Sequence, residues 1–203
     1  MRPPRLTPTT SAIRLSPPRA EKAQYRLGMN DFVALVPVDE LPADLRANFD
    51  ATDRPGLRDF IRMMANAPDH YRRYNEVYGH VRYDNHLGAR LTELVRLAVA
   101  QTTQCQLCLS GRDPTAIADG LTEEMVIELI ADDRPHLSEA EEAAVNFAFK
   151  FGSDHTAITE QEKKALQTYF TAEQIIELGL LCVMCMVGRF SMLAGIEAAS
   201  CAV

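Results

Sequence analysis

Apolar residues recur at three- and four-residue spacing along most of this chain, which is the period of an amphipathic α-helix. The clearest stripe lies in residues 90–102, where Leu91, Leu94, Val95 and Ala98 share one face. Ala, Leu, Glu, Arg and Gln, which favour helices, are abundant. This pattern predicts a chain built from helices that bury one face each.

Capping residues divide the periodic pattern into separate helices. Ser138 and Thr159 are each followed three positions later by glutamate, the sequence of a capping box. Thr171 caps the last long helix, and Gly120 suits a left-handed helix C-terminus. We predict an all-α fold of seven to nine helices and allow a strand only at 32–38. The expected helices span residues 41–51, 56–67, 69–83, 90–102, 105–119, 125–131, 143–151, 159–170 and 173–194.

The first 28 residues differ from the rest of the chain. They hold five prolines and six Lys/Arg residues against the single acid Glu21. Such a segment buries too little apolar surface to offset its ordering entropy. We predict a disordered, basic, Pro-rich tail over 1–28 and one helical domain over 29–203. A transit peptide, or a start of translation at Met29, are alternative readings of the tail.

The net charge of −7 makes nucleic acid and anionic lipid unfavourable partners for the surface as a whole. The longest apolar run, residues 178–188, is shorter than the ~20 residues that a membrane span needs. No secretory signal pattern is visible at the N-terminus. We therefore expect a cytoplasmic protein without a membrane segment.

Cys105 and Cys108 form a C-x-x-C pair near a predicted helix start, within a polar neighbourhood. A helix N-terminus offers unpaired N–H groups that lower a thiol pKa, and the thiolate is the nucleophilic form. Two sulfurs at this spacing can close into a disulfide after one of them attacks a peroxide or a disulfide. The motif predicts a redox-active pair.

A second C-x-x-C pair, Cys182 and Cys185, lies inside an apolar helix, where cysteine behaves as a small hydrophobe. We predict core packing for this pair. The alternative is a four-cysteine zinc site, but zinc ribbons separate their pairs by about 15–20 residues and the gap here is far longer.

Glu93 lies among the apolar residues of the clearest helical stripe. A half-buried carboxylate has a raised pKa and can serve as a proton shuttle. The alternative is a glutamate that is favoured only by the N-terminal dipole of its helix.

The chain resembles the carboxymuconolactone decarboxylase/AhpD-like family from about residue 35 to 197. The resemblance rests on the spacing of a glutamate, the C-x-x-C pair and a Gly-Leu-Thr motif, and it continues in the second half. The matching segments are Glu93-Leu94-Val95-Arg96-Leu97-Ala98-Val99-Ala100-Gln101, Cys105 and Cys108, Gly120-Leu121-Thr122-Glu123-Glu124, Phe170-Thr171-Ala172-Glu173-Gln174 and Gly188-Arg189-Phe190.

The resemblance implies an AhpD-like helical bundle that forms a homo-oligomer and needs no cofactor or metal. It implies that Cys108 attacks a peroxide or small disulfide substrate, that Cys105 resolves the product as a disulfide, and that Glu93 belongs to a proton relay. A dihydrolipoyl group or another dithiol, such as a thioredoxin-like protein, would be the reductant.

Two features depart from the family pattern. One is Asp113-Pro114, which has the pattern of a helix cap followed by a first-turn proline, so the helix expected over 105–119 can kink or restart there. The other is an arginine. Arg112 stands four residues after the second cysteine, where the family usually has histidine. A guanidinium cannot relay a proton, because it stays charged, but it can stabilise a thiolate at Cys108. His80 or His86 is an alternative source of the missing imidazole.

Three functions remain open on the sequence. The first is a thiol peroxidase or dithiol–disulfide oxidoreductase that uses Cys108, Cys105, Glu93 and Arg112. The second is a cofactor-free lactone decarboxylase, against which the cysteine pair argues. The third is a non-catalytic helical oligomer whose cysteines only sense redox state.

Overall fold

The structure is a computed structural model that describes residues 32–196. The predicted tail over 1–28, Met29 and Cys201 lie outside these residues. The predicted all-α class is confirmed, and residues 32–38, where a strand was allowed, contain none. The described chain folds into the α-helices α1 (Ala43–Asp50), α2 (Pro55–Met64), α3 (Pro68–Tyr83), α4 (Ala89–Thr103), α5 (Gln106–Leu109), α6 (Pro114–Ala118), α7 (Glu123–Glu128), α8 (Glu139–Ser153), α9 (Glu160–Tyr169), α10 (Ala172–Cys185) and α11 (Val187–Leu193), with 3-10 turns at Val38–Glu40 and His155–Ala157.

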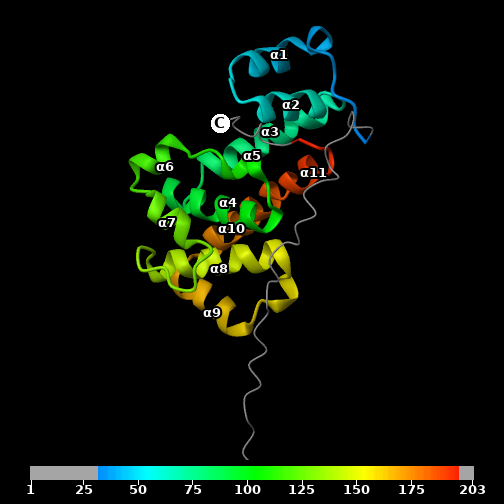
Figure 1. Ribbon diagram of the computed structural model, residues 1–203. Helices are drawn as coiled ribbons and strands as arrows, with labels where there is room; N and C mark the ends of the chain where they lie inside the picture. The colour runs from blue at the N-terminus through cyan, green and yellow to red at the C-terminus, as the bar shows by residue number, and fades with distance from the viewer. Residues whose placement is uncertain (1–31, 197–203) are drawn as a thin grey trace, which may run out of the picture.

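Helix α4 is the centre of the molecule. Every residue from 91 to 100 is buried, which includes polar Glu93 and Arg96. α4 packs against α8 and α10 and also contacts α5 and α6, as Figure 1 shows. Because α4 is enclosed on all sides, its polar side chains must be satisfied by other protein groups.

A smaller second core lies at the end of the molecule formed by α1 and α2 (Figure 1). Phe60, Ile61 and Met63 of α2 pack there with Tyr71 of α3 and with Ala194, which follows α11. The ring of Phe60 meets that of Tyr71 edge-on at 5.9 Å. Two cores therefore meet along α3 and α11, and the cavity described below lies at their junction.

The predicted helix caps are present. Ser138 with Glu141 and Thr159 with Glu162 form reciprocal capping boxes, and Thr171 caps α10. Gly120 has the left-handed φ of 87°. The helix ends that were predicted from these capping residues are therefore confirmed.

Several predicted boundaries differ from the structure. The single helix expected over 173–194 is divided at Met186 into α10 and α11. The helix expected over 105–119 is divided into α5 and α6, because Asp113 caps a new helix that has Pro114 in its first turn. The helix expected over 41–51 begins later, at Ala43 after Pro42, and a 3-10 turn at Val38–Glu40 precedes it.

The stretch Ala172–Leu193, in which α11 follows α10, is long and apolar enough to cross a membrane by length and composition. It is longer than the 178–188 run from which we expected no span. The core helix of a soluble protein passes the same test. Leu178, Leu181 and Cys182 are fully buried on α10, which packs against α4, so the fold accounts for part of this apolar character, with 33% of the apolar window buried.

Gly152 in α8 predicts a sensitive packing contact. A Cβ at this position would lie 2.3 Å from Oγ1 and 3.2 Å from Cβ of Thr102 on α4. We expect Gly152→Ala to lower the free energy of unfolding by about 1–3 kcal/mol through overpacking. Chemical denaturation measures this change.

The matched control is Gly179→Ala in α10, where a Cβ would meet no atom within 4 Å. This change should be neutral or stabilising, because alanine favours helix more than glycine does. Combining Gly152→Ala with Thr102→Ala should restore part of the stability. Equal stability of the two single variants would contradict the packing argument.

Candidate active site

The cysteine pair lies at a sharp turn between α4 and α5. Gln104 adopts the left-handed conformation with φ of 54° and ends α4, and Cys105 is the N-cap of α5. The Cys105 sulfur accepts a hydrogen bond of 3.3 Å from the backbone N–H of Cys108. The two Sγ atoms are 2.7 Å apart, so the structure brings both predicted thiols into direct contact.

The two sulfurs differ in their access to solvent. Cys105 is fully buried, whereas Cys108 is half-buried and lines a cavity. Gly188 of α11 packs against Cys105. A Cβ at position 188 would lie 3.2 Å from the Cys105 sulfur. A substrate in the cavity therefore reaches Cys108 first.

The thiol pKa values diverge because the two sulfurs share a proton. The hydrogen bond from the Cys108 thiol lowers the pKa of Cys105 to about 7, and the N–H of Cys108 and the charge of Arg96 add to this effect. The same hydrogen bond, together with burial, raises the pKa of Cys108. Coupled groups of this kind titrate as a pair, and the pair loses its first proton near neutral pH.

A buried ion pair on α4 contacts the backbone of the C-x-x-C motif. Arg96 donates two hydrogen bonds of 2.7 Å to the carboxylate of Glu93, one turn earlier on α4. The same guanidinium donates to the carbonyl oxygens of Cys108 at 2.6 Å and Gly111 at 3.0 Å. Arg96 therefore ties the backbone that follows the C-x-x-C motif to the central helix.

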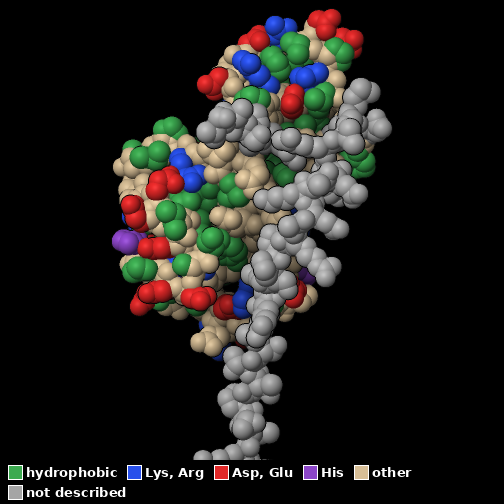
Figure 2. Space-filling model, in the orientation of Figure 1, with side chains coloured by type: hydrophobic (Ala, Val, Ile, Leu, Met, Phe, Trp, Pro, Cys, Tyr) green, Lys and Arg blue, Asp and Glu red, His purple; other side chains and the backbone are tan. Residues whose placement is uncertain are grey.

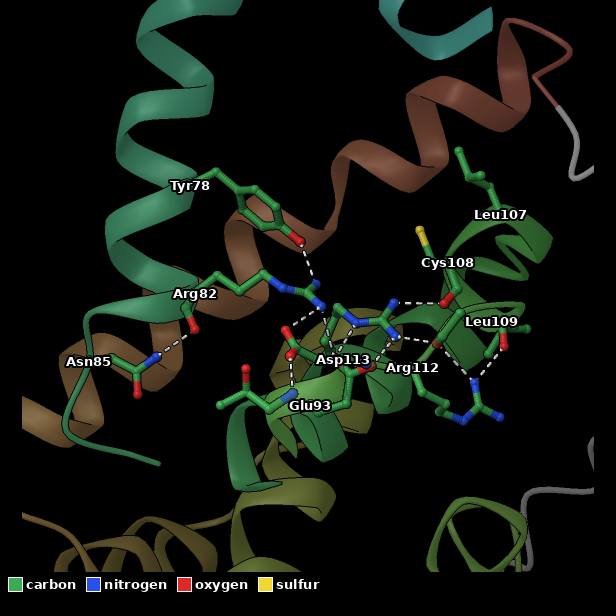
Figure 3. Close-up of polar contacts among 12 residues, drawn as sticks. Tyr78, Arg82, Asn85, Glu93, Leu107, Cys108, Leu109, Arg112 and Asp113 are labelled. Carbon is green, nitrogen blue, oxygen red and sulfur yellow. Dashed lines mark hydrogen bonds and ion pairs between the residues drawn. The ribbon is translucent and has the colours of Figure 1, made fainter. Parts of the chain in front are cut away.

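Glu93 is held by further partners. Its carboxylate accepts a hydrogen bond of 3.0 Å from the Asp113 N–H and lies 3.1 Å from Nη2 of Arg82, as Figure 3 shows. Burial alone would raise the pKa of Glu93, but Arg96 and Arg82 hold it below its usual value. The expected raised pKa of Glu93 was therefore wrong, because two buried guanidinium groups pair with this carboxylate.

The arginine that replaces the family histidine lies differently from our expectation. Arg112 donates to Glu123 at 2.9 and 3.1 Å and to the carbonyl oxygens of Leu109 and Gly111. Figure 3 shows its guanidinium on the side of the backbone away from the Cys108 sulfur. The contacts of Arg112 give no support to the expected stabilisation of a Cys108 thiolate. The arginine whose positive charge favours the thiolate form of both cysteines is Arg96, although its contribution at Cys108 is smaller than the opposing effects that raise that pKa.

The two histidines that were considered as substitutes lie elsewhere. His80 pairs with Asp84, and His86 pairs with Glu177, both at the exposed surface. Neither lines the cavity of Cys108. The lining residues of that cavity include no histidine, so no imidazole faces the sulfur from the described part of the chain.

The cavity at Cys108 has a volume of about 270 Å³ and lies at the junction of the two cores. Its walls come from α2, α3, α5 and α11, and Arg96 of α4 reaches them. They are aromatic, apolar and cationic. The principal lining residues are Arg54, Leu57, Phe60, Tyr74, Tyr78, Arg82, Tyr83, Leu107, Arg112 and Val187.

Sequence reasoning missed two arginines of this site. Arg96 is three residues after Glu93, a spacing that places both on one helix face, so the ion pair could have been anticipated. Arg54, just before α2, donates to the carbonyl of Leu107 at 2.6 Å and to Oγ of Ser110 at 3.1 Å. No local pattern indicates a contact across 53 positions of sequence.

The second cysteine pair is packed as predicted. Cys182 and Cys185 are buried, and burial raises the pKa of both thiols, that of Cys185 to about 11. Between residues 32 and 196 the side chains close enough to share an ion are His86, Glu173 and Glu177, at the exposed surface. The four cysteines of the described chain are therefore not gathered as a zinc site would require.

Part of the chain matches a known protein family. The sequence model described as the carboxymuconolactone decarboxylase family matches residues 68–150. No protein among curated sequences matches the chain.

Solved structures with low sequence identity share the fold. A variant of the debrominase Bmp8 in complex with 2,3,4-tribromopyrrole is 16% identical with a TM-score of 0.66, and the match covers 86% of this chain and 95% of that one. An AhpD-core protein from Ralstonia eutropha JMP134, described as peroxidase-related, is 18% identical with a TM-score of 0.64 over 82% and 90% of the chains. A protein of unknown function from Agrobacterium tumefaciens, described as a putative antioxidant defence protein AhpD, is 16% identical with a TM-score of 0.57 over 69% and 95%.

The shared proton of the pair predicts a distinctive titration. We expect one thiol of the pair to ionise near pH 7, so that alkylation accelerates as the pH rises through neutrality. Cys108→Ala removes the hydrogen bond to the Cys105 sulfur, so the midpoint should move upward, toward the ~8.5 of an ordinary cysteine. Ultraviolet absorbance of the thiolate as a function of pH measures both midpoints.

Cys182→Ala is the control, because Cys182 is buried and is not among the groups that lower the pKa of Cys105. Its titration should match that of the unchanged protein. An unshifted midpoint in Cys108→Ala would show that the two sulfurs do not share a proton.

Proposed function

Because this chain belongs to the carboxymuconolactone decarboxylase/AhpD-like family, we propose that it is a thiol-dependent peroxidase, or more broadly a dithiol–disulfide oxidoreductase. The observation that carries the proposal is the pairing of a cavity-lining sulfur, Cys108, with a buried sulfur, Cys105, at 2.7 Å. A substrate can approach the first sulfur, and the second is already in place to resolve it.

The first step is attack by Cys108 on the substrate. With the shared proton on Cys105, the Cys108 thiolate attacks one peroxide oxygen, and the O–O bond breaks. The leaving alkoxide takes a proton from solvent water, equivalent to the one that the thiol pair released when it ionised, and departs as the alcohol. Cys108 is then a sulfenic acid, so sulfur has been oxidised by two electrons and the peroxide reduced by two.

The second step closes the disulfide. The sulfur of Cys105 attacks the sulfur of Cys108, the S–O bond breaks, and water leaves with the proton of Cys105. An external dithiol of the lipoyl or thioredoxin-like kind then reduces the disulfide by exchange and is itself oxidised. The supply of such dithiols leads us to propose the cytoplasm as the location of the protein.

Glu93 and Arg96 are positioning residues in this proposal. Glu93 stays ionised because Arg96 and Arg82 flank it, so it holds Arg96 rather than carrying a proton. Arg96 in turn fixes the carbonyl of Cys108 and lowers the pKa of the pair. This division of roles replaces the proton relay that the resemblance implied.

A second candidate is reductive removal of halogen from an aromatic ring. It is favoured by the tyrosine-lined cavity next to Cys108, and the fold is shared with a debrominase. The two thiols would supply two electrons, so that aryl bromide and the dithiol give arene, bromide, a proton and the disulfide. A lactone decarboxylase would have no use for the paired sulfurs and is a weaker candidate.

We also propose that the protein forms a homo-oligomer through α10. Ile176, Leu180 and Val183 lie on one face of this helix at spacings of four and three, and they are 63%, 46% and 53% exposed. A stripe of large apolar side chains open to water is typical of an interface. A second copy of the same chain is the occupant that the family resemblance favours.

The redox proposal predicts the products of a single turnover. After one equivalent of peroxide, differential alkylation and peptide mass spectrometry should find a Cys105–Cys108 disulfide that dithiols reverse. Cys108→Ser should lose turnover to background, because no other sulfur lines the cavity among residues 32–196. Cys105→Ser should stop at a sulfenic acid on Cys108, which a dimedone-type reagent traps.

Cys182→Ala serves as the control and should retain turnover, since Cys182 is buried in the core. Thiols that stay reduced with peroxide, while bromide is released from a bromoaromatic, would replace the peroxidase with the dehalogenase. Full turnover by Cys108→Ser would defeat both thiol mechanisms.

The oligomer proposal predicts a change in mass. Ile176→Glu combined with Val183→Glu places charges in the α10 stripe and should shift the light-scattering mass toward the monomer. Val77→Glu on α3, at a position that is 51% exposed, is the matched control and should leave the mass unchanged. A monomeric unchanged protein would overturn the proposal.

A further inference from the structure

The cavity at Cys108 carries a charge pattern that its chemistry with peroxide does not require. We propose that this cavity selects small organic anions with a flat aromatic body, and that Arg54 holds the anionic group. The inference names the substrate class of the proposed function and rests on it. Four observations carry it: the balance of charge, the partners of Arg54, an unpaired atom of Arg82, and the aromatic walls.

The balance of charge around the cavity is positive. Four arginines line it, namely Arg54, Arg82, Arg96 and Arg112. The carboxylates that pair with them are three, Glu93, Asp113 and Glu123. Within the described part of the chain, one guanidinium in the wall is therefore left without a carboxylate partner, although the full sequence carries a net charge of −7.

The wall thus differs from the outer surface of the molecule. Figure 2 shows acidic side chains spread over the face formed by α6 to α9. A cationic recess in an otherwise acidic protein attracts anions locally, because low-dielectric walls concentrate its field. Peroxides without a charge gain nothing from such a recess.

Of the four lining arginines, Arg54 is the one that makes no ion pair within residues 32–196. Its Nη2 makes both of its hydrogen bonds, to Leu107 and Ser110, so Nη1 and Nε retain donor capacity. Gly111 leaves room for the guanidinium, since a Cβ there would lie 3.1 Å from Nη1. Arg54 is thereby held over α5, beside Cys108, with donors still available to a ligand.

Arg82 supplies a second unsatisfied donor. Its Nε is buried and has no hydrogen-bond partner, while its other nitrogens bond to Tyr78, Glu93 and Asp113. Buried donors are nearly always paired, and an unpaired one requires an explanation. Arg82 also lines the cavity, so in this proposal a ligand oxygen pairs with Nε once a shift of the side chain exposes that atom.

The remaining walls fit a flat apolar body. The rings of Tyr74 and Tyr78 are stacked at 5.7 Å with planes only 11° apart, and Leu57 and Val187 also line the cavity. Aromatic faces and branched side chains bind aromatic rings through dispersion and offset stacking. The volume of about 270 Å³ limits the ligand to a single substituted ring.

Binding can be tested without turnover. We would titrate Cys108→Ser protein by calorimetry with benzoate and with benzamide, which has the same shape but no charge. We expect benzoate to bind about tenfold or more tightly than benzamide, since charge-assisted hydrogen bonds are the stronger kind. Equal affinity for the two probes, or tighter binding of benzamide, would overturn the inference.

Substitutions identify the residue responsible. Arg54→Met in the Cys108→Ser background should abolish the preference for benzoate, and Arg54→Lys should keep most of it. Arg73→Met is the matched control, because Arg73 is exposed on α3, does not line the cavity, and carries the same charge. Persistence of the preference in Arg54→Met, or its loss in Arg73→Met, would contradict the assignment to Arg54.

Turnover separates this inference from the proposed function. With intact cysteines, an arylhydroperoxide that bears a carboxylate should be used with a kcat/KM about tenfold higher than its neutral parent. The readout is the ratio of these two kcat/KM values within one protein, and Arg54→Met should bring that ratio close to one whatever its overall rate. Benzoate binding without any peroxide turnover would contradict the peroxidase proposal and support the anion site. Peroxide turnover without a preference for the charged substrate would contradict the anion site and support the peroxidase.

Discussion

The buried pairing of Glu93 with Arg96 is the interaction on which the site depends. Both residues lie within α4, which is enclosed on all sides, so neither charge can be hydrated. Removing one partner of a buried pair leaves an uncompensated charge and costs about 3–5 kcal/mol. Arg96 therefore holds the carbonyls of Cys108 and Gly111 in a fixed position. The loop that carries the cysteines is thus anchored to the central helix by hydrogen bonds of a buried side chain.

This constraint also decides which group handles protons. A carboxylate that accepts two hydrogen bonds from one arginine, and lies beside Arg82 as well, remains ionised and cannot exchange a proton in each cycle. In the proposed mechanism, the proton that is transferred is instead the one between the sulfurs of Cys105 and Cys108. A shared proton lets one thiol ionise near neutral pH with no imidazole nearby, which makes the missing histidine tolerable.

The sequence was informative where structure is set by neighbours along the chain. The capping boxes at Ser138 and Thr159 and the restart at Asp113 are local hydrogen-bond patterns, and each could be predicted. Side-chain direction was harder, because Arg112 bonds to Glu123 eleven residues away, and its proximity to Cys108 in sequence was misleading. Arg54 could not be predicted, since its contact with α5 exists only once the two cores have met.

The more acidic of the two thiols is not the one that a substrate can reach. The proton that the two sulfurs share explains how both can take part in one reaction. Cys105 is the more acidic sulfur but is fully buried, so it cannot meet a substrate. Cys108 lines the cavity and holds the proton at rest. Transfer of that proton across 2.7 Å converts the reachable sulfur into the thiolate and leaves the buried one as the thiol. Cations in the cavity wall, Arg96 among them, favour a negative sulfur at Cys108 as substrate displaces water there. In the proposed mechanism, the thiolate of the resting state is therefore the buried sulfur of Cys105, and the reachable sulfur of Cys108 becomes the nucleophile only after this proton transfer.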